Sequence, residues 1–540
     1  MKAERNYSLA DLFAIAAETV PDRIAVMIGD ESHTFRSMAA RIERLAAWLH
    51  AQGIGEGDVV GLQMYNSAEY LETFLAACRV RAVPANFNYR YVADELRYLY
   101  SNSRIKALFY SEDLESAVAE ALDAAPELKV KVRSGAGRPT VKGAVSFTDA
   151  ISMTDLSGLR NVRGQDTDIS LLYTGGTTGK PKGVMWPHKE FFFGCLGGGG
   201  YFLPTEGPVK NPEELADRIL KGPVIRFMPV APLMHGAAHW ATMVALYAGH
   251  TVVLNDQTHF NAEHVLDLVA RHQVNSLTVV GDAMALPILD ALRAHRGRWD
   301  LSRLAIFGNG GAVLSGHVMD ALKEFFPPHI YFSNGIGSSE GGQFGMGARS
   351  TDGGMLKIAA RPDLAVLVDG KRLATPGETG ILARGGMVPL GYFGDPAKTA
   401  ETFVTIDGRR YAITGDAAKV GEDGAIVVFG RGSNCINTGG EKVFPEEVEE
   451  VLRMSPEISD AVVVGMPDPR WGQKVVAVVS PRPGVSFDAK SLRELCRQHL
   501  AGYKVPKDVI PVAEVFRSAA GKANYVWAKT VAEAALADAQ

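Results

Sequence analysis

Cysteine is scarce in this sequence of 540 residues. The four cysteines, Cys78, Cys195, Cys435 and Cys496, lie far apart, and no two of them form a CxxC pair. This spacing does not favour a zinc cluster. We therefore expect unpaired, reduced thiols in a cytoplasmic protein.

The sequence also lacks a strong excess of charge and any long apolar run. Its 56 basic and 61 acidic residues give a net charge of −5, which does not favour nucleic acid or an anionic membrane as a partner. The longest apolar candidate, FFFGCLGGGGYFL at 191–203, is broken by glycines and is shorter than the roughly 18 residues of a membrane span. Acidic residues in the first apolar segment predict an amphipathic helix rather than a signal peptide. We expect no integral membrane association.

Most of the chain alternates between helical and extended patterns. Its length exceeds what one core supports, so two or three folding units are expected. Residues 37–53 have helical spacing and end at Gly53, residues 58–65 form a buried strand pattern, and residues 67–81 are again helical. A strand, helix and strand follow in the same order at 251–281. This alternation predicts an α/β fold with parallel βαβ units.

The pattern changes after about residue 370. Short strands joined by Gly/Asp turns indicate an antiparallel β region up to about residue 430. A compact α+β unit follows, with a helix at 445–454 that starts at Pro445, strands at 460–468 and 474–483, and a helix at 491–502. The flexible stretch GRGSN at 430–434 separates the two. We therefore predict an N-terminal domain at 1–430, a hinge at 431–434 and a C-terminal domain at 435–540.

A loop rich in glycine and threonine, YTGGTTGKPKGV at 173–184, is suited to binding phosphate. Its glycines let backbone amides approach an anion, its hydroxyls donate hydrogen bonds, and its lysines supply positive charge. It is not a Walker A motif, because Thr174 and Pro181 stand where that motif needs glycine and Ser/Thr. A flexible surface loop would explain the glycines but not the ordered run of threonines and lysines.

This loop closely resembles the signature of the adenylate-forming superfamily, which includes acyl-CoA synthetases, firefly luciferase and peptide-synthetase adenylation domains. Six other segments resemble signatures of the same superfamily in the same order: MPVAPLMHGAAHW, GNGGAVLSG, NGIGSSEGG, YAITGDAAKV, GRGSNCINTGGEKVFPEEVEE and AAGKANYVWAK. The resemblance covers essentially the whole chain. It implies a large N-terminal domain of βαβ subdomains plus a β-rich subdomain, and a small mobile α+β C-terminal domain.

The resemblance also implies a reaction in two steps. A carboxylate attacks the α-phosphate of ATP, giving acyl-AMP and pyrophosphate, and the thiol of CoA then displaces AMP. Positive charge and a metal ion are needed to bring a carboxylate to a polyanion. The implied cofactors are therefore ATP, Mg²⁺ and CoA as co-substrate.

The resemblance carries over to individual residues of the ATP site. Thr174, Gly175, Gly176, Thr177, Thr178, Gly179 and Lys182 would hold the β- and γ-phosphates. Glu340 would hold Mg²⁺, a hard cation that prefers oxygen ligands, and Ser339 would lie at the α-phosphate. Asp416 would bind the ribose hydroxyls, and Arg431 the ribose or phosphate. Gly310, Gly311, Ala312, Asn334 and Gly335 would frame the adenine, with Ile336 where the family usually has an aromatic residue.

Two residues would act on the acyl group or near it. Lys522 matches the lysine that stabilises charge during adenylation, and His235 would lie beside the acyl carboxylate. His235 and His239 are four apart, but Gly236 replaces the glutamate of a metalloprotease and no third zinc ligand is apparent. The other expected pocket residues are Trp186, Gly236, His239, Trp240, Gly337 and Gly341.

Two further assignments concern the second step. Gly439 and Gly440 would leave room for the pantetheine arm of CoA, although a tight hairpin also explains these glycines. Ser433 occupies the position where family members often carry Asp or Lys as the hinge of a domain rotation. Serine is compatible with a hinge, but the charge is absent.

The acyl substrate is the least defined feature. Glycines at 197–200, 236, 341 and 342 are expected to leave volume for a bulky acyl group. Phe191, Phe192, Phe193 and Trp186 would form apolar walls, although core packing explains these aromatics equally well. The segments 186–199 and 228–240 most resemble bacterial fatty-acyl and steroid-side-chain CoA ligases. We expect a medium- or long-chain, aryl or bulky carboxylic acid.

Several alternatives remain open at this stage. A stand-alone adenylation enzyme would pass the acyl group to a carrier protein or another acceptor. A peptide-synthetase domain would need an aspartate for the amino-acid ammonium, and none stands out. A luciferase-like oxygenase shares the fold, whereas a silent nucleotide-binding regulator would be expected to have lost Lys522 or Glu340. The oligomeric state is open, with a homodimer as one candidate.

Overall fold

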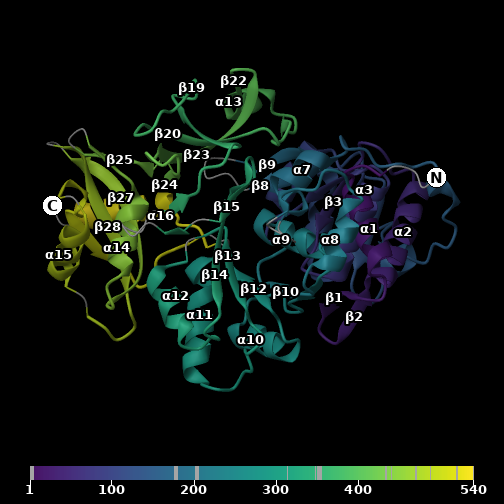
Figure 1. The fold of residues 1–540 in the computed structure, drawn as a ribbon, viewed down its shortest axis with the longest axis horizontal. Helices are drawn as coiled ribbons and strands as arrows, with labels where there is room; N and C mark the ends of the chain where they lie inside the picture. Colours follow the sequence, from purple (N-terminus) through teal and green to yellow (C-terminus); the bar gives the residue numbers. More distant parts are fainter. Residues whose placement is uncertain are drawn as a thin grey trace.

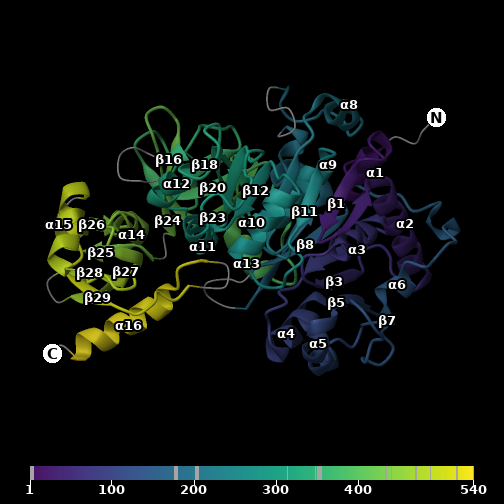
Figure 2. The same ribbon diagram turned by 90° about the horizontal axis from the view of Figure 1, so that it is seen from below.

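The computed structural model describes residues 5–174, 180–200, 206–312, 314–346, 348–349, 356–431, 434–438, 441–468, 471–486, 488–500, 502–517 and 521–538. Figure 1 shows the N-terminal part at the right and centre and a smaller C-terminal part at the left, with the two chain ends at opposite sides. Figure 2 shows the same separation from below. The predicted α/β fold, with a large N-terminal domain and a small C-terminal domain, is confirmed.

The first sheet of the N-terminal part has the strand order β21-β9-β8-β4-β3-β5-β6-β7. Strands β3 to β8 that neighbour one another run parallel, while β8, β9 and β21 are antiparallel. The strands are β3 (Val59–Gln63), β4 (Val83–Asn86), β5 (Ala107–Ser111), β6 (Val130–Ser134), β7 (Val145–Ser146), β8 (Ile169–Thr174), β9 (Lys182–Pro187) and β21 (Gly391–Tyr392).

The second sheet has the order β15-β14-β13-β12-β10-β11-β1-β2, with parallel pairs inside and an antiparallel strand at each edge. Its strands are β1 (Ile24–Ile28), β2 (Glu31–Thr34), β10 (Arg226–Pro229), β11 (Thr251–Leu254), β12 (Ser276–Val279), β13 (Ile306–Gly310), β14 (Tyr331–Ser338) and β15 (Gly342–Met346). The predicted parallel βαβ units are therefore confirmed.

Helices pack on these two sheets and on one another. They are α1 (Leu9–Thr19), α2 (Phe35–Ala51), α3 (Ala68–Arg79), α4 (Ala93–Ser103), α5 (Glu115–Ala121), α6 (Phe147–Ala150), α7 (His188–Gly194), α8 (Glu214–Lys221), α9 (Gly236–Tyr247), α10 (Ala262–Arg271), α11 (Gly281–Ala294) and α12 (Gly316–Lys323). Helix α1 contacts α2, α3, α8 and α9, and one large apolar core joins these helices.

Local sequence signals account for several helix ends. The hydroxyl of Ser67 accepts a hydrogen bond of 3.1 Å from the Tyr70 amide at the start of α3. The hydroxyl of Thr34 caps α2 in the same way through the Ser37 amide. Beyond the end of α2, Gly53 has a φ of +73°, as expected of a glycine that ends a helix.

The third sheet is antiparallel and has the order β16-β17-β24-β23-β20-β18-β19, with β22 beside β23. Its elements are β16 (Ala348–Arg349), β17 (Leu356–Ile358), β18 (Leu364–Val368), β19 (Arg372–Leu373), β20 (Thr379–Gly385), β22 (Phe403–Ile406), β23 (Arg409–Val420), β24 (Ile426–Arg431) and the helix α13 (Pro396–Thr402). The predicted antiparallel region is present but begins before residue 370. Strands as short as β16 and β17 show no periodicity in the sequence.

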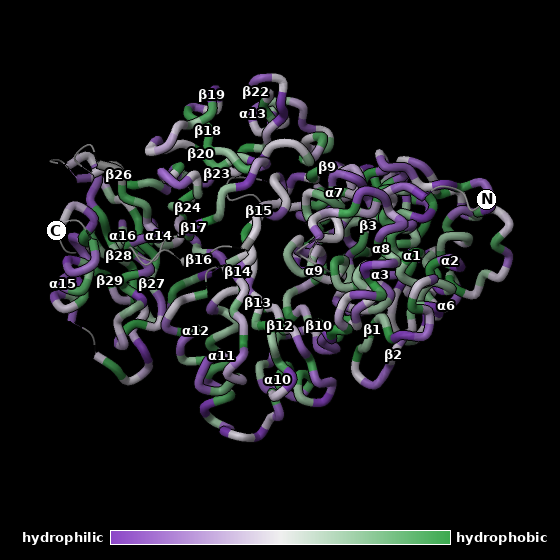
Figure 3. The backbone as a smooth tube through the Cα atoms, in the orientation of Figure 1, coloured by the Kyte–Doolittle hydropathy of each residue, from purple (hydrophilic) through white to green (hydrophobic). Residues whose placement is uncertain are grey.

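The C-terminal part has its own sheet, in the order β26-β25-β28-β27 with β29 beside β28. Its elements are β25 (Ile436–Thr438), β26 (Glu441–Val443), α14 (Pro445–Arg453), β27 (Ile458–Asp468), β28 (Gly472–Pro481), α15 (Ala489–His499), β29 (Asp508–Pro511) and α16 (Tyr525–Asp538). Separate apolar cores lie on the two faces of this sheet. Figure 3 shows that hydrophobic and hydrophilic segments alternate along the elements of both parts. Within the described ranges, none of the helices has both the length and the apolar character that a membrane span requires.

Candidate active site

The candidate phosphate loop connects two paired strands. Thr174, the last residue of β8, lies opposite Lys182, the first residue of β9, in the antiparallel register. The loop therefore leaves and re-enters the sheet at one point. The other predicted phosphate-binding residues, Gly175, Gly176, Thr177, Thr178 and Gly179, lie outside the described residues.

Lys182 and Glu340 both contact the side chain of Tyr392. The Nζ atom of Lys182 lies 5.3 Å from the centre of this ring and 3.4 Å from a carboxylate oxygen of Asp395. The Tyr392 hydroxyl donates a hydrogen bond of 2.9 Å to Oε1 of Glu340. Burial and the negative charge of Glu340 raise the pKa of Tyr392, so the hydroxyl remains a donor. Tyr392 thus connects the phosphate loop to the predicted metal ligand.

The turn that carries Glu340 is held on several sides. It joins β14 to β15, and the indole N–H of Trp186 donates a hydrogen bond of 2.9 Å to the Ser339 carbonyl. The Gly341 amide donates to the hydroxyl of Ser338 at 2.9 Å. The buried guanidinium of Arg384 donates to the Gly341 carbonyl at 3.2 Å. These contacts fix the direction in which Glu340 leaves the turn.

The predicted adenine-binding residues lie at the carboxyl ends of two neighbouring parallel strands. Gly310 at the end of β13 is in register with Gly335 of β14. The side chain of the buried Asn309 donates to the Ala312 carbonyl at 2.9 Å and to Asn334 Oδ1 at 3.2 Å. Loops at the carboxyl ends of parallel strands are the usual place for a nucleotide in an open α/β sheet.

Two other predicted adenine-site residues follow Gly310 and Gly335 directly. Gly311 has a φ of +89°, which favours glycine. Ile336 is partly buried and packs against the apolar core of the third sheet. The structure therefore brings together all six residues predicted around the adenine.

Asp416 and Arg431 lie directly across from each other on β23 and β24. The Asp416 amide donates a hydrogen bond of 3.1 Å to the hydroxyl of Thr414. The structure describes Arg431 by its backbone. The register places both predicted ribose-binding residues at the same position along the sheet.

The segment that carries Lys522 reaches from the C-terminal sheet to the N-terminal part. A methyl group added to Gly521 would lie 3.4 Å from Cβ of Ala283 in α11 and 3.7 Å from Cβ of Ala312. Figures 1 and 2 both show the chain before α16 extending toward α11. Lys522 therefore follows a residue that lies beside Ala312 of the candidate adenine site.

Lys522 also acts electrostatically on His235. Burial, together with the positive charges of Arg90 and Lys522, lowers the pKa of His235 to about 4. The imidazole is therefore neutral near pH 7. Two of the predicted catalytic groups, far apart in the sequence, lie within electrostatic range of each other.

The expected acyl-pocket residues His239, Trp240 and Trp186 are all buried. Their exposed fractions are 4%, 8% and 0%. His239 lies among the rings of Phe74, Tyr70 and Phe191, with centroid distances of 4.4, 6.1 and 6.3 Å. Burial lowers its pKa to about 3.

The partly exposed residues of α9 are different ones. Ala237, Ala241 and Val244 are half-buried. The Cβ atom of Ala237 lies 3.7 Å from the position that a Cβ on Gly310 would occupy. Ala237 and Ala241 are small residues four apart in the sequence, on the opposite face of α9 from His239. This spacing was the sequence signal for the partly exposed face of the helix.

The prediction that the glycines leave volume for the acyl group is wrong at several positions. An added Cβ would lie 3.0 Å from the Trp240 ring at Gly236, 2.5 Å from the Phe344 ring at Gly341, and 2.5 Å from the Gly194 carbonyl oxygen at Gly342. At Gly198 it would lie 2.4 Å from Phe193. Gly337, an expected pocket residue, is packed in the same way, with an added Cβ 2.5 Å from the Gly342 carbonyl oxygen. These glycines allow neighbouring groups to pack closely, because the space of the missing side chain is already filled.

Comparison with known proteins identifies the family. The profile of the AMP-binding enzyme matches residues 13–393, and that of the AMP-binding enzyme C-terminal domain matches residues 447–522. The chain belongs to the AMP-binding enzyme family. The resemblance seen in the sequence is confirmed.

Relatives of this AMP-binding enzyme match over nearly their full length. It is 41% identical to the medium-chain acyl-CoA ligase Mig of Mycobacterium avium, with 96% of each chain covered. It is also 41% identical to the medium/long-chain-fatty-acid–CoA/3-oxocholest-4-en-26-oate–CoA ligase of Mycobacterium tuberculosis, with 98% of this chain and 97% of that protein covered. The 3-oxocholest-4-en-26-oate–CoA ligase of Rhodococcus rhodochrous is 38% identical, with 97% and 95% covered.

Solved structures show the same fold. The anthranilate CoA ligase AuaEII, crystallised with anthranoyl-AMP, superposes with a TM-score of 0.83 at 24% identity, and the match covers 99% of this chain and 100% of that one. The ATP-bound MatB of Rhodopseudomonas palustris superposes with a TM-score of 0.77 at 25% identity, with 96% and 98% covered.

Three further residues were predicted for the second step of this AMP-binding enzyme. Ser433, Gly439 and Gly440 lie outside the described residues. Four residues that contribute to the site were missed in the sequence: Arg90, Asn309, Ala237 and Tyr392. Among the described residues, no group of three His, Cys, Asp or Glu side chains is arranged to hold a metal ion.

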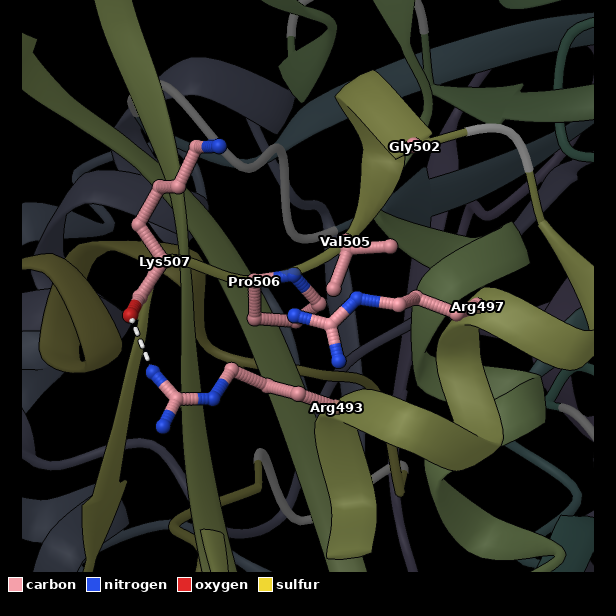
Figure 4. A pocket seen from close by; sticks show the side chains of 6 residues that line it. All are labelled: Arg493, Arg497, Gly502, Val505, Pro506 and Lys507. Carbon is pink, nitrogen blue, oxygen red and sulfur yellow. Dashed lines mark hydrogen bonds between the residues drawn. The ribbon is translucent and has the colours of Figure 1, made fainter. Parts of the chain in front are cut away.

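The C-terminal part of the AMP-binding enzyme carries a cationic hollow of about 180 Å³. Figure 4 shows Arg493 and Arg497 from α15 on one side and Lys507 on the other, with Val505 and Pro506 between Lys507 and Arg497. Arg493 donates a hydrogen bond of 3.0 Å to the Lys507 carbonyl. Glu494 pairs with Arg497 at 2.9 Å. The hollow is suited to an anionic group.

Proposed function

We propose that this AMP-binding enzyme is an ATP-dependent acyl-CoA ligase. In the first step a carboxylate oxygen bonds to the α-phosphorus of ATP, and the bond to the β-phosphate oxygen breaks to release pyrophosphate. In the second step the sulfur of CoA bonds to the acyl carbon, AMP leaves with the carboxylate oxygen, and the thiol proton is released. The observation that carries the proposal is the approach of the Lys522 segment to Ala312 and His235.

Charge placement supports the roles of the residues in the first step. We assign Lys522 to the oxygens of the carboxylate and α-phosphate, where negative charge has to be stabilised. A neutral His235 beside the acyl carboxylate is able to donate a hydrogen bond without adding charge. Lys182 and the phosphate loop are assigned to the β- and γ-phosphates, and Asp416 and Arg431 to the ribose side.

Glu340 is the proposed Mg²⁺ ligand. One of its oxygens accepts the Tyr392 hydroxyl at 2.9 Å, which orients the carboxylate. Mg²⁺ in nucleotide sites is usually held by one or two carboxylates together with phosphate oxygens and water, so a single glutamate fits. When bound, the ion would neutralise charge on the phosphates.

The second step is assigned to a rotated C-terminal domain. We propose domains at 1–430 and 435–540 with the hinge at 431–434, including Ser433. Strand β24 belongs to the third sheet and β25 to the C-terminal sheet, so the chain changes sheets between Arg431 and Ile436. Gly439 and Gly440 are assigned to the pantetheine channel. The cationic hollow offers positive charge to the phosphates of a co-substrate such as CoA.

The proposed substrates are medium- and long-chain fatty acids, or bulky steroids that carry the carboxylate on their side chain. Support comes from the similarity to ligases whose names specify these acids, at 38% to 41% identity over almost the whole chain. No disulfide links the cysteines of the described residues, which fits the proposed location in the cytoplasm.

Pyrophosphate release with a panel of fatty, aryl and sterol-side-chain acids, with and without CoA, tests the proposal. An acyl-CoA ligase releases one pyrophosphate per acyl-CoA formed, and sustained turnover requires CoA. Sustained turnover without CoA, or transfer of the acyl group only to a carrier protein, would assign a different second step. Absence of pyrophosphate release with every acid would overturn the proposal.

A further inference from the structure

Arg517 contacts the peptide unit that leads into Lys522. The backbones of Arg517 and Ala523 form an isolated antiparallel bridge. The Nη1 atom of Arg517 donates a hydrogen bond of 3.2 Å to the Gly521 carbonyl. This carbonyl belongs to the same planar peptide unit as the amide nitrogen of Lys522.

The same guanidinium is anchored in the C-terminal sheet. Its Nε and Nη2 atoms donate to both carboxylate oxygens of Asp460, at 2.5 and 2.7 Å. Asp460 belongs to β27. A bidentate pair of this kind fixes the plane of the guanidinium as well as its position. Arg517 therefore connects a strand of the sheet to the peptide unit that leads into Lys522.

A second ion pair lies behind Asp460. Arg453 of α14 is 5% exposed, lies 3.6 Å from Asp460 Oδ1, and donates a hydrogen bond of 3.1 Å to the Ala461 carbonyl. Glu449, 3% exposed, lies 3.7 Å from Arg453 and accepts the Val463 amide at 3.0 Å. Asp460 is thus held between two guanidinium groups and has little freedom to move.

The other side of Gly521 faces the N-terminal part. Gly521 has a φ of +70°, and the position of a Cβ there lies 3.4 Å from Ala283 and 3.7 Å from Ala312. Its carbonyl is held by Arg517, while the side of its α-carbon where a Cβ would stand faces Ala283 and Ala312. The peptide unit between Gly521 and Lys522 is therefore fixed from two directions.

We propose that Arg517 is a positioning residue for Lys522, a role that rests on the proposed function. It holds the Gly521–Lys522 peptide unit so that the lysine points to the reacting carboxylate and α-phosphate. Lys522 is assigned to the first step alone, so Arg517 should matter for acyl-adenylate formation and not for thioester formation. An ion pair that only stabilised the domain would affect both steps alike.

The geometry distinguishes arginine from lysine at this position. The Nε and Nη2 atoms of Arg517 donate to Asp460, and its Nη1 atom donates to the Gly521 carbonyl. A lysine ammonium is a single point charge and does not reproduce the rigid fork. The Arg517→Lys variant should retain an ion pair with Asp460 while losing its firm hold on the carbonyl.

The test measures the two half-reactions separately in the full-length enzyme. Acyl-adenylate formation is followed as pyrophosphate release in a single turnover without CoA. Thioester formation is followed as acyl-CoA from pre-formed acyl-adenylate and CoA. The variants are Arg517→Met and Arg517→Lys. The control is Lys474→Met, which removes a partly buried ion pair of 2.9 Å with Asp508 in the same sheet.

Arg517→Met should lower the rate of acyl-adenylate formation about 10- to 100-fold, as expected when a catalytic group is displaced by about 1 Å. The rate of thioester formation should stay close to that of the unchanged enzyme. Arg517→Lys should give a smaller loss in the same step, and Lys474→Met should alter neither.

Equal losses in both half-reactions, or no loss of acyl-adenylate formation, would overturn the proposal. If Arg517→Met does not fold, Arg517→Lys decides by the same comparison. Failure of the proposed function would give a different result, because the unchanged enzyme would then release no pyrophosphate with any acid.

Discussion

The hydroxyl of Tyr392 donates a hydrogen bond of 2.9 Å to the carboxylate of Glu340. Lys182, at the end of the phosphate loop, lies over the same ring. A tyrosine therefore holds the proposed metal ligand and one of the proposed phosphate ligands in a common arrangement. The contact crosses 52 positions of sequence and joins two sheets of the N-terminal part.

Tyr392→Phe should weaken the orientation of Glu340. A hydrogen bond to a charged group contributes about 1.5 to 3 kcal/mol, so the rate of acyl-adenylate formation should fall about tenfold or more, and half-saturation with Mg²⁺ should need a higher concentration. A Mg²⁺ titration of pyrophosphate release measures both. Tyr247→Phe is the control, because it removes a buried hydroxyl bond of 3.0 Å to the Leu9 carbonyl far from Glu340 in the sequence. An unchanged Mg²⁺ dependence in Tyr392→Phe would contradict the role of this contact.

Asp416→Ala should remove recognition of the ribose. Loss of hydrogen bonds to a carboxylate should lower kcat/KM for ATP about 10- to 100-fold. The specific readout is 2′-deoxy-ATP: the unchanged enzyme should prefer ATP, whereas the variant should use the two nucleotides almost equally. A variant that still prefers ATP by the full factor would show that Asp416 does not bind the ribose.

Gly342→Ala should destabilise the fold through packing as well as backbone conformation. Gly342 has a φ of +69°, and a Cβ there would lie 2.5 Å from the Gly194 carbonyl oxygen. Gly53 has a φ of +73° with nothing within 4 Å, which makes Gly53→Ala a matched control for the backbone alone. We expect a loss of about 1 to 2 kcal/mol in the free energy of unfolding for Gly53→Ala and about 3 kcal/mol or more for Gly342→Ala. Equal losses in denaturant titrations would show that the carbonyl moves away freely.

His239 should make stability depend on pH on the acidic side. Burial lowers its pKa from 6.5 to about 3, so the unfolded chain binds a proton that the folded protein does not bind between these values. Stability should therefore fall as the pH falls through this window. Replacement by phenylalanine should reduce the gradient of the unfolding free energy near pH 5 by about 1.4 kcal/mol per pH unit.

Denaturant titrations at pH 5, 6 and 7 measure this gradient. His499→Gln is the control, because His499 is exposed at the end of α15. A gradient that is the same in His239→Phe and in the unchanged protein would show that the ring titrates in the folded state.

Elements with strong local signals could be predicted from the sequence. Helix α3 follows a serine cap, α14 starts at Pro445, and α2 is followed by a glycine with positive φ. The short strands β16 and β17 were missed because two or three residues show no alternation. Their positions depend on pairing with β24, which is distant in the sequence.

The candidate site was predictable where residue chemistry and order were distinctive, as for Glu340, Asp416 and Lys522. Tyr392, Asn309 and Arg517 act by holding other residues through long-range contacts, which leave no local pattern. The glycines around Trp186 and Phe344 led to a wrong prediction of free volume for the acyl group, for a related reason. A sequence shows that a side chain is absent but not which neighbour fills its place.

The most direct test of the account is the Lys522→Ala variant, measured in the two half-reactions. Lys522 is the residue through which the C-terminal domain is proposed to stabilise charge at the α-phosphate. We predict that single-turnover pyrophosphate release falls by about 100-fold or more, while acyl-CoA formation from pre-formed acyl-adenylate continues near the rate of the unchanged enzyme. Acyl-adenylate formation at an undiminished rate would contradict the account.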